Sequence, residues 1–263
     1  MVSAFILLGA VVGFAVGATG VGGGSLMTPG LIWLFGVPPT VAVGTDLLYA
    51  TLSKGFAATL LALRREILWP LVGLLSLGSL PATALTVSLA HTLLGPQQLA
   101  WLVQVVLSVA IILTALFTLM RGRLFPHPRS DVQQGDHASI GRQRTLTVLT
   151  GVLIGVLVGL TSVGAGVVGM ALLLLLYPQY SSLRLMSSDL VHAVLVTAVA
   201  GAGHALNGSV DYALLGALLA GAIPGTWLGV HIAVRLNERT LKQIITTVLL
   251  LVGIVSLART VAA

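Results

Sequence analysis

The chain of 263 residues contains no cysteine, and only 8% of its residues are charged. The lack of cysteine excludes disulfides, thiol chemistry and cysteine-ligated metal centres. So few charged side chains cannot be arranged as the surface of an ordinary soluble protein. The sequence also lacks the strand-length alternation of polar and apolar residues that a transmembrane β-barrel requires. These absences leave an integral membrane protein built from helices.

What the chain has instead is apolar sequence, with 57% hydrophobic residues and a mean hydropathy of +1.06. Crossing a bilayer as a helix takes about 20 apolar residues. The N-terminal run lacks a preceding basic segment and continues past its glycines, so we interpret it as part of the fold and not as a cleaved signal peptide. The apolar runs cover residues 2–37, 41–63, 67–90, 99–120, 146–177, 185–206, 210–235 and 241–261.

The net charge of +6 comes from basic residues in short polar segments between these runs, which is typical of membrane orientation signals and not of nucleic-acid binding. One sizeable polar segment, residues 121–145, contains five arginines and two prolines. We predict that this segment is a cytoplasmic linker. It separates a first transmembrane repeat, residues 1–120, from a second, residues 146–263.

The two halves repeat each other. Residues 13–24 read GFAVGATGVGGG and residues 155–166 read GVLVGLTSVGAG, and Thr45-Asp46-Leu47 returns as Ser188-Asp189-Leu190. Placing the basic segments inside the cell makes the run at 146–177 a hairpin. If the equivalent run at 2–37 has the same form, the second half is upside down relative to the first. The predicted fold is therefore all-α, with two inverted repeats, each a glycine-broken helical hairpin followed by three transmembrane helices. Re-entrant half-helices and short tilted helices both stay open, which leaves eight to ten membrane segments.

A glycine cluster within an apolar run interrupts a helix and exposes backbone N–H groups that can bind an anion. For Gly13, Gly17, Gly151 and Gly155 the GxxxG spacing favours close helix packing instead. The residues predicted to bind the anion are Thr19, Gly20, Gly22, Gly23, Gly24, Ser25, Thr161, Ser162, Gly164 and Gly166.

Ionisable residues inside membrane spans are functional candidates by default. Asp46 and Asp189 occupy equivalent positions and are predicted to face the glycine breaks, although each could instead only offset a helix dipole. Lys54 has no equivalent in the second half and would supply positive charge. His192 follows Asp189 by three residues, so this pair is the candidate for proton coupling or gating. Asp46 is a further candidate for the same role.

Other histidines and the tryptophans receive structural interpretations. His204 and His231 are predicted to form interhelical hydrogen bonds, and Trp69, Trp101 and Trp227 to anchor the chain at the membrane interface. No two histidines are spaced by three or four residues, so no metal or other cofactor is expected.

The segment GATGVGGGSLMTPGL followed by AVGTDLL resembles the sulfite exporter TauE/SafE family, also called the toluene sulfonate uptake permease family, and the likeness covers nearly the whole chain. The second copy departs from the motif at Ala165, Met170 and Ala171. The resemblance implies a bacterial inner-membrane transporter that moves sulfite, sulfoacetate or other sulfur-containing organic anions. The residues that match the motif are Gly20, Gly22, Gly23, Gly24, Pro29, Gly44, Thr45 and Asp46.

Together these features predict a secondary transporter that binds a small anion between the two glycine breaks and alternates access by rocking its inverted halves. An anion channel and a non-transporting assembly subunit are the alternatives. We find no nucleophile–base pair in the sequence, so an enzyme is not expected. The expected partners are the anion and the lipid bilayer, and a homodimer stays open.

Overall fold

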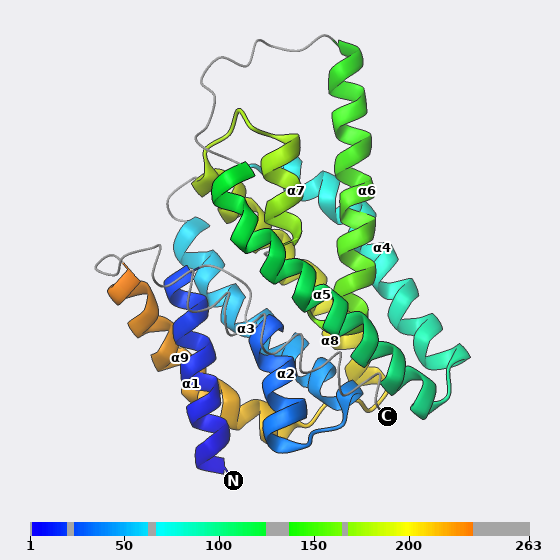
Figure 1. The fold of residues 1–263 in the computed structure, drawn as a ribbon, viewed down its shortest axis with the longest axis vertical. Coiled ribbons are helices and arrows are strands. Elements are labelled where there is room, and N and C mark those ends of the chain that lie inside the picture. The colour runs from blue at the N-terminus through cyan, green and yellow to red at the C-terminus, as the bar shows by residue number, and fades with distance from the viewer. Residues whose placement is uncertain (1, 20–23, 63–66, 125–136, 165–167, 234–263) are drawn as a thin grey trace.

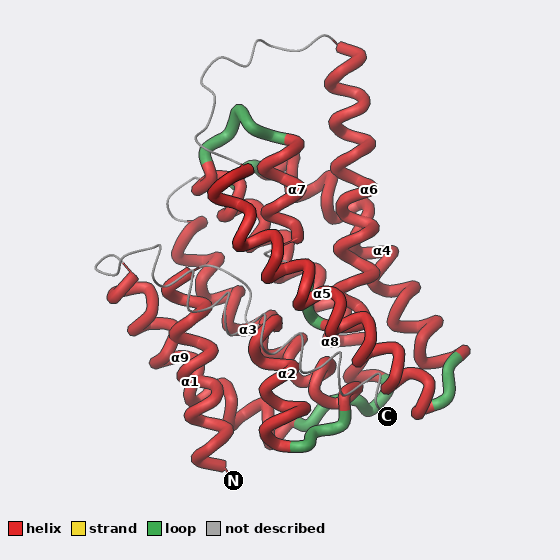
Figure 2. The backbone as a smooth tube through the Cα atoms, viewed as in Figure 1, coloured by secondary structure: helices red, strands yellow, loops and turns green. Residues whose placement is uncertain are grey.

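The computed structural model describes residues 2–19, 24–62, 67–124, 137–164 and 168–233. Within these ranges all regular structure is helical (Figure 2). The prediction of an all-α protein is therefore confirmed. The helices are α1 (Val2–Thr19), α2 (Gly24–Phe35), α3 (Pro39–Ala62), α4 (Trp69–Leu93), α5 (Pro96–Leu124), α6 (His137–Thr161), α7 (Val168–Leu176), α8 (Ser182–Leu206) and α9 (Tyr212–Ala233).

Each over-long apolar run is divided at its glycine cluster, the first into α1 and α2 and the second into α6 and α7. With 12 and 9 residues, α2 and α7 are too short to cross the hydrocarbon core, which takes about 20 residues. Five described segments are long and apolar enough to cross it, so the chain is a multi-pass membrane protein. The last apolar run, 241–261, lies outside the described residues. The five segments are Trp69–Leu93, Pro96–Leu113, Gly141–Thr161, Arg184–Leu206 and Tyr212–Gly229.

Helix ends follow local signals in the sequence. Gly36 adopts a φ of 66° directly after α2, a conformation that favours glycine at a helix C-terminus. The Ser181 hydroxyl accepts a hydrogen bond from the Arg184 N–H at 3.4 Å and caps α8. At the other end of the polar linker, α6 begins at His137, nine residues before the apolar run that starts at residue 146. Hydropathy located the apolar part of this helix and not its polar first turns.

The helices pair across the two halves. In Figure 1, α1 and α9 form one flank, α4 and α6 form the other, and α3 and α8 lie between them. The central pair runs antiparallel: Gly44 lies against His204, and further along α3 the Thr51 hydroxyl donates to the Thr197 hydroxyl at 3.0 Å. Because α3 and α8 are equivalent in the repeat, the centre of the molecule consists of two matching helices that run in opposite directions.

Glycines let the flanking helices touch. A Cβ added to Gly13 of α1 would lie 2.7 Å from the Ala222 carbonyl oxygen of α9. In the equivalent pair, a Cβ on Gly155 of α6 would collide with the Ser79 carbonyl of α4. The close packing that the GxxxG spacing predicts is present on both flanks.

Candidate functional site

Four ionisable side chains lie in the interior at the contact of α3 and α8. Asp46 and Lys54 belong to α3, and Asp189 and His192 belong to α8. Their exposed fractions are 0%, 2%, 3% and 0%, respectively. Burying a charged group costs roughly several kcal/mol, unless opposite charges and hydrogen bonds compensate for the lost hydration. Such a cluster at the centre of a membrane protein is a candidate site.

Asp46 lies between the short helix α2 and the glycine break that follows α6. The Thr28 hydroxyl of α2 donates to Asp46 Oδ2 at 2.5 Å. Ser162, just after α6, also lies near this carboxylate, without reaching hydrogen-bond geometry. Asp46 Oδ1 and Ser162 Oγ are both buried and have no hydrogen-bond partner in the described part of the chain. Asp46 therefore contacts α2, and it also lies near the break in the second half.

The second break is a sharp turn of the backbone. Ser162 has a φ of 61°, which costs a non-glycine residue about 1–2 kcal/mol, and Gly164 has a φ of 132°. Thr161 stabilises the turn, since its hydroxyl donates to the Leu157 carbonyl at 2.7 Å and accepts from the Val163 N–H at 3.2 Å. The hydroxyl of Thr161 is thus engaged by backbone groups, whereas that of Ser162 points to the carboxylate side of the break.

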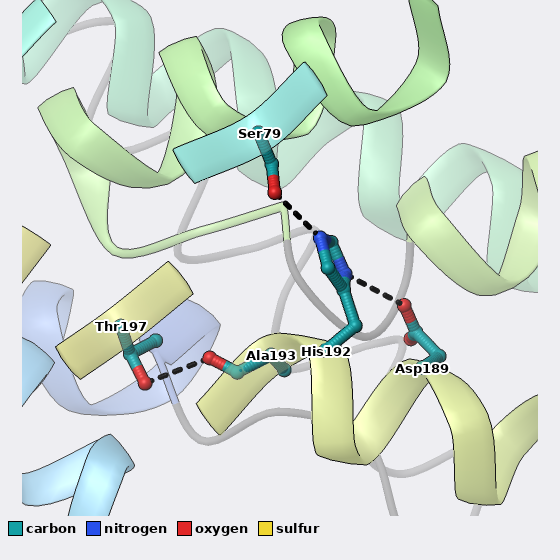
Figure 3. Close-up of polar contacts among 5 residues, drawn as sticks. All are labelled: Ser79, Asp189, His192, Ala193 and Thr197. Atoms are coloured by element: carbon teal, nitrogen blue, oxygen red, sulfur yellow. Dashed lines mark hydrogen bonds and ion pairs between the residues drawn. The ribbon is translucent and has the colours of Figure 1, made fainter. Parts of the chain in front are cut away.

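His192 lies between Ser79 and Asp189 (Figure 3). Its Nε2 is 2.8 Å from the Ser79 hydroxyl of α4, and its Nδ1 is 3.9 Å from Asp189 Oδ1. The second distance is too long for a hydrogen bond but suits an ion pair when the imidazole is protonated. Both atoms of that pair are buried without a hydrogen bond among the described residues. The imidazole therefore lies between a hydroxyl and a carboxylate.

The two aspartates have different surroundings despite their equivalence. On α7, Gly169 packs so closely against Asp189 that an added Cβ would lie 2.5 Å from Oδ1. The position equivalent to Thr28 is Met170, which has no hydroxyl to donate. Asp46 thus has a hydroxyl donor from its half-helix, and Asp189 has a histidine on its own helix instead.

Lys54 lies within Coulombic range of both Asp189 and Asp46. In the second half its position is taken by Thr197, whose hydroxyl donates to the Ala193 carbonyl at 2.8 Å. One ammonium from the first half therefore interacts with a carboxylate from each half. With all three groups ionised, two negative charges face one positive charge.

Further polar side chains link the helices around this cluster. The hydroxyl of Tyr49, the counterpart of His192, approaches the Gly9 carbonyl of α1 at 3.5 Å. His204 makes the interhelical contact expected of it, with Nε2 2.9 Å from the Gly159 carbonyl and Nδ1 3.3 Å from His91 Nε2. These contacts bind α3 and α8 to the flanking helices.

Several predicted residues are placed only in part. Thr19 ends α1 and Gly24 begins α2, with Ser25 directly after it, and the side chains of Thr19 and Ser25 are outside what the structure describes. The same holds for the His231 side chain, while Trp69, Trp101 and Trp227 are exposed as interfacial anchors should be. The described residues contain no group of three potential metal ligands. The predicted residues that lie entirely outside the described ranges are Gly20, Gly22, Gly23 and Gly166.

Sequence reasoning missed Ser79 and Gly169. A weak signal existed for Ser79, which is a polar residue at the position where the second half has Ala222. No local pattern distinguishes Gly169 from a packing glycine, because its contact with Asp189 depends on how α7 packs against α8.

Comparison with known proteins identifies a family and two related proteins. The family described as "Sulfite exporter TauE/SafE" matches residues 5–256. The chain is 36% identical over 252 residues to the probable membrane transporter protein YjnA of Bacillus subtilis (strain 168), covering 95% of this chain and 97% of that protein. It is 23% identical over 267 residues to the probable membrane transporter protein YunE of the same organism, with 94% of each chain covered. No solved structure gives a significant match.

Proposed function

Because the chain belongs to the sulfite exporter TauE/SafE family and is a membrane transporter, we propose that it is a secondary transporter of small sulfur-containing anions. Sulfite, sulfoacetate and related organosulfonates are the substrate class, and the bacterial inner membrane is the location. The observation that carries the proposal is a buried lysine, Lys54, in Coulombic range of one aspartate from each half.

The anion binds next to Lys54, between the two breaks. Half-helix α2 begins at Gly24, directly after the glycine cluster, so its N-terminal N–H groups and dipole favour negative charge. Ser162 on the opposite side has a buried hydroxyl available to donate a hydrogen bond. The glycines of both clusters allow the backbone to approach an oxyanion closely, which is the role we assign to Gly20, Gly22, Gly23, Gly164 and Gly166.

Charge balance requires a proton to accompany the anion. With Asp46, Asp189 and Lys54 ionised the buried site carries one net negative charge, and an added anion would raise this to two or more. Such a charge is very costly inside a membrane. A proton taken up by the His192–Asp189 pair neutralises the carboxylate and releases Lys54 to the anion, so proton and substrate bind together.

The antiparallel contact of α3 and α8 supports the inverted repeat on which alternating access depends. Equivalent helices that cross a membrane in opposite directions belong to halves of opposite orientation. In this mechanism the flanks, α1 with α9 and α4 with α6, rock about the central pair. The site is then open to one side of the membrane at a time.

The test is sulfite flux into proteoliposomes that contain the purified full-length chain, measured over a range of external pH. We expect saturable uptake that an inward proton gradient stimulates. Lys54→Ala should abolish uptake, and Asp189→Asn should remove the stimulation. The mechanism fails if both variants retain normal flux and normal pH dependence.

Asp211→Asn is the matched control, because Asp211 is an exposed carboxylate that caps α9 through a 2.9 Å hydrogen bond from the Leu214 N–H. Asparagine caps a helix equally well, so this variant should transport like the parent. Counterflow of labelled sulfite distinguishes a transporter from an anion channel, which would show none. A purified chain without any flux would indicate an assembly subunit.

A further inference from the structure

A pocket of about 170 Å³ opens between the start of α4, the start of α6 and the turn that follows α7. It shares no residue with the cluster around Lys54. The residues that line it are Leu68, Pro70, Leu71, Leu74, Gln143, Arg144, Tyr177 and Tyr180.

The lining is apolar on one side and polar on the other. Pro70, Leu71 and Leu74 of α4 form the apolar side. On the polar side, Tyr177 shares a 2.7 Å hydrogen bond with Thr147, and the Gln143 amide donates to the Leu176 carbonyl. The Tyr177 and Gln143 side chains are therefore each held by a hydrogen bond.

Two polar groups of the lining remain available. Arg144 is exposed, and among the described residues no hydrogen bond or ion pair engages its guanidinium. The Tyr180 hydroxyl is likewise without a hydrogen bond to any residue that the structure describes. Among the residues that the structure describes, no acidic residue lines the pocket, and Arg142 adds a further positive charge two residues away. The polar side therefore presents a cation and a hydroxyl donor to an anionic group.

The pocket lies at the level of the membrane surface. Three of the five membrane-crossing segments start around it, at Trp69, Gly141 and Arg184. The Trp69 side chain is 64% exposed beside it, and tryptophan and tyrosine collect at the interface between the hydrocarbon and water. Any occupant must consequently match a polar headgroup region on one side and hydrocarbon on the other.

We propose that this pocket binds an anionic phospholipid, with the headgroup phosphate on Arg144 and Tyr180 and the start of an acyl chain along Leu71 and Leu74. Basic pockets at the ends of transmembrane helices bind anionic headgroups in this way. The divided lining favours a lipid over a free phosphate ion, because a free ion would leave the apolar side unfilled. The proposal is independent of the transported anion.

The experiment is native mass spectrometry of the purified full-length chain in detergent, with dioleoyl phosphatidylglycerol and dioleoyl phosphatidylcholine added at equal concentration. We expect preferential retention of phosphatidylglycerol. Arg144→Ala should weaken this retention about fivefold, the loss typical of one basic residue at an anionic membrane surface. Tyr180→Phe should weaken it less. Arg142→Ala is the matched control and should retain the lipid, since it removes the same charge from an exposed position on α6 outside the lining.

Three results would overturn the proposal. Equal retention of the two lipids shows that the headgroup charge is not recognised. An Arg142→Ala variant as weak as Arg144→Ala shows diffuse attraction and no site. Competition by free glycerol 3-phosphate or by sulfite at the lipid's own concentration identifies a soluble anion as the occupant. Since Arg144 is exposed, circular dichroism and gel filtration should show that the variant is folded, and Arg144→Lys should recover part of the retention.

Discussion

Lys54 is the residue on which the proposed binding of an anion depends. It is 2% exposed and within Coulombic range of Asp189 and Asp46, so it contributes both to folding and to charge balance. Removing one partner of a buried ionic group leaves uncompensated charge and typically costs about 3–5 kcal/mol. A loss of transport in a lysine variant is therefore informative only when stability is measured as well.

A single and a double variant separate the contribution of Lys54 to stability from its contribution to transport. Lys54→Met should lower the free energy of unfolding by several kcal/mol, of the order expected for a broken buried ion pair, and should abolish anion uptake. Adding Asp189→Asn restores the net charge of the parent site, so the double variant should recover most of the stability. It should still show no uptake, because the ammonium group that holds the anion is gone. Thermal unfolding in detergent and sulfite flux measure the two quantities, and recovery of flux in the double variant would contradict the role of Lys54.

Thr28 offers a second test at this scale. Its hydroxyl donates to the buried Asp46 carboxylate at 2.5 Å, and Thr28→Val keeps the shape while removing the donor. A buried carboxylate that loses a donor should cost about 1–3 kcal/mol of stability. Thr59→Val is the control, because the Thr59 hydroxyl is exposed and, among the described residues, bonds only to the Phe56 carbonyl of its own helix at 2.8 Å. Equal melting temperatures for the two variants would show that the contact to Asp46 contributes nothing.

At the scale of the helix, two glycines of the flanking helices, Gly13 and Gly73, lie in similar apolar sequence but have different surroundings. Gly13 faces the backbone of α9, and an added methyl group would be 2.7 Å from the Ala222 carbonyl oxygen. Gly73 lies within α4, and an added Cβ would meet no atom within 4 Å. Whether alanine is harmful thus depends on the partner helix and not on the helix that contains the glycine.

This difference predicts opposite signs for two substitutions. Gly13→Ala should separate α1 from α9 and destabilise the protein by about 1–3 kcal/mol, as overpacking does. Gly73→Ala should leave stability unchanged or raise it by up to about 1 kcal/mol, the difference in helix propensity. Thermal unfolding of both variants in one detergent is the measurement. A Gly13→Ala variant as stable as Gly73→Ala would contradict the packing of this flank.

Helices and breaks were largely predictable from the sequence, because hydropathy and glycine clusters act locally. The pairing of helices was not. The repeat identifies α1 with α6 and α4 with α9, but the contact of α1 with α9 joins residues about 200 positions apart, and no local pattern encodes it. Asp46, Asp189 and Lys54 were recognisable as candidates because each is an ionisable residue in an apolar run. That both aspartates lie near Lys54 could be seen only in the tertiary structure.

For the whole molecule, the proposed inverted repeat makes a prediction that the lack of cysteine makes easy to test. The chain has no cysteine, so each introduced cysteine is the sole thiol. Cysteines at Gly95 and Gly208 should react with an impermeant maleimide added outside intact cells, and one at Gln179 should react only after the cells are opened. These sites lie in the turns after α4, α8 and α7, respectively. Labelling of the Gly95→Cys and Gln179→Cys variants from the same side would rule out the proposed topology.

The unequal chemistry of the two halves has a kinetic consequence. In a transporter with strictly identical inverted halves, the inward-open and outward-open states would be interchangeable and equally populated at rest. Here Lys54 stands opposite Thr197, and His192 stands opposite Tyr49, so the two end states place different groups at the mouth of the site. In the proposed mechanism their free energies must then differ, and the empty protein rests facing one compartment. The half-saturating substrate concentration should therefore differ between the two faces of the membrane, with a compensating difference in maximal rate, because no carrier produces net flux without a gradient.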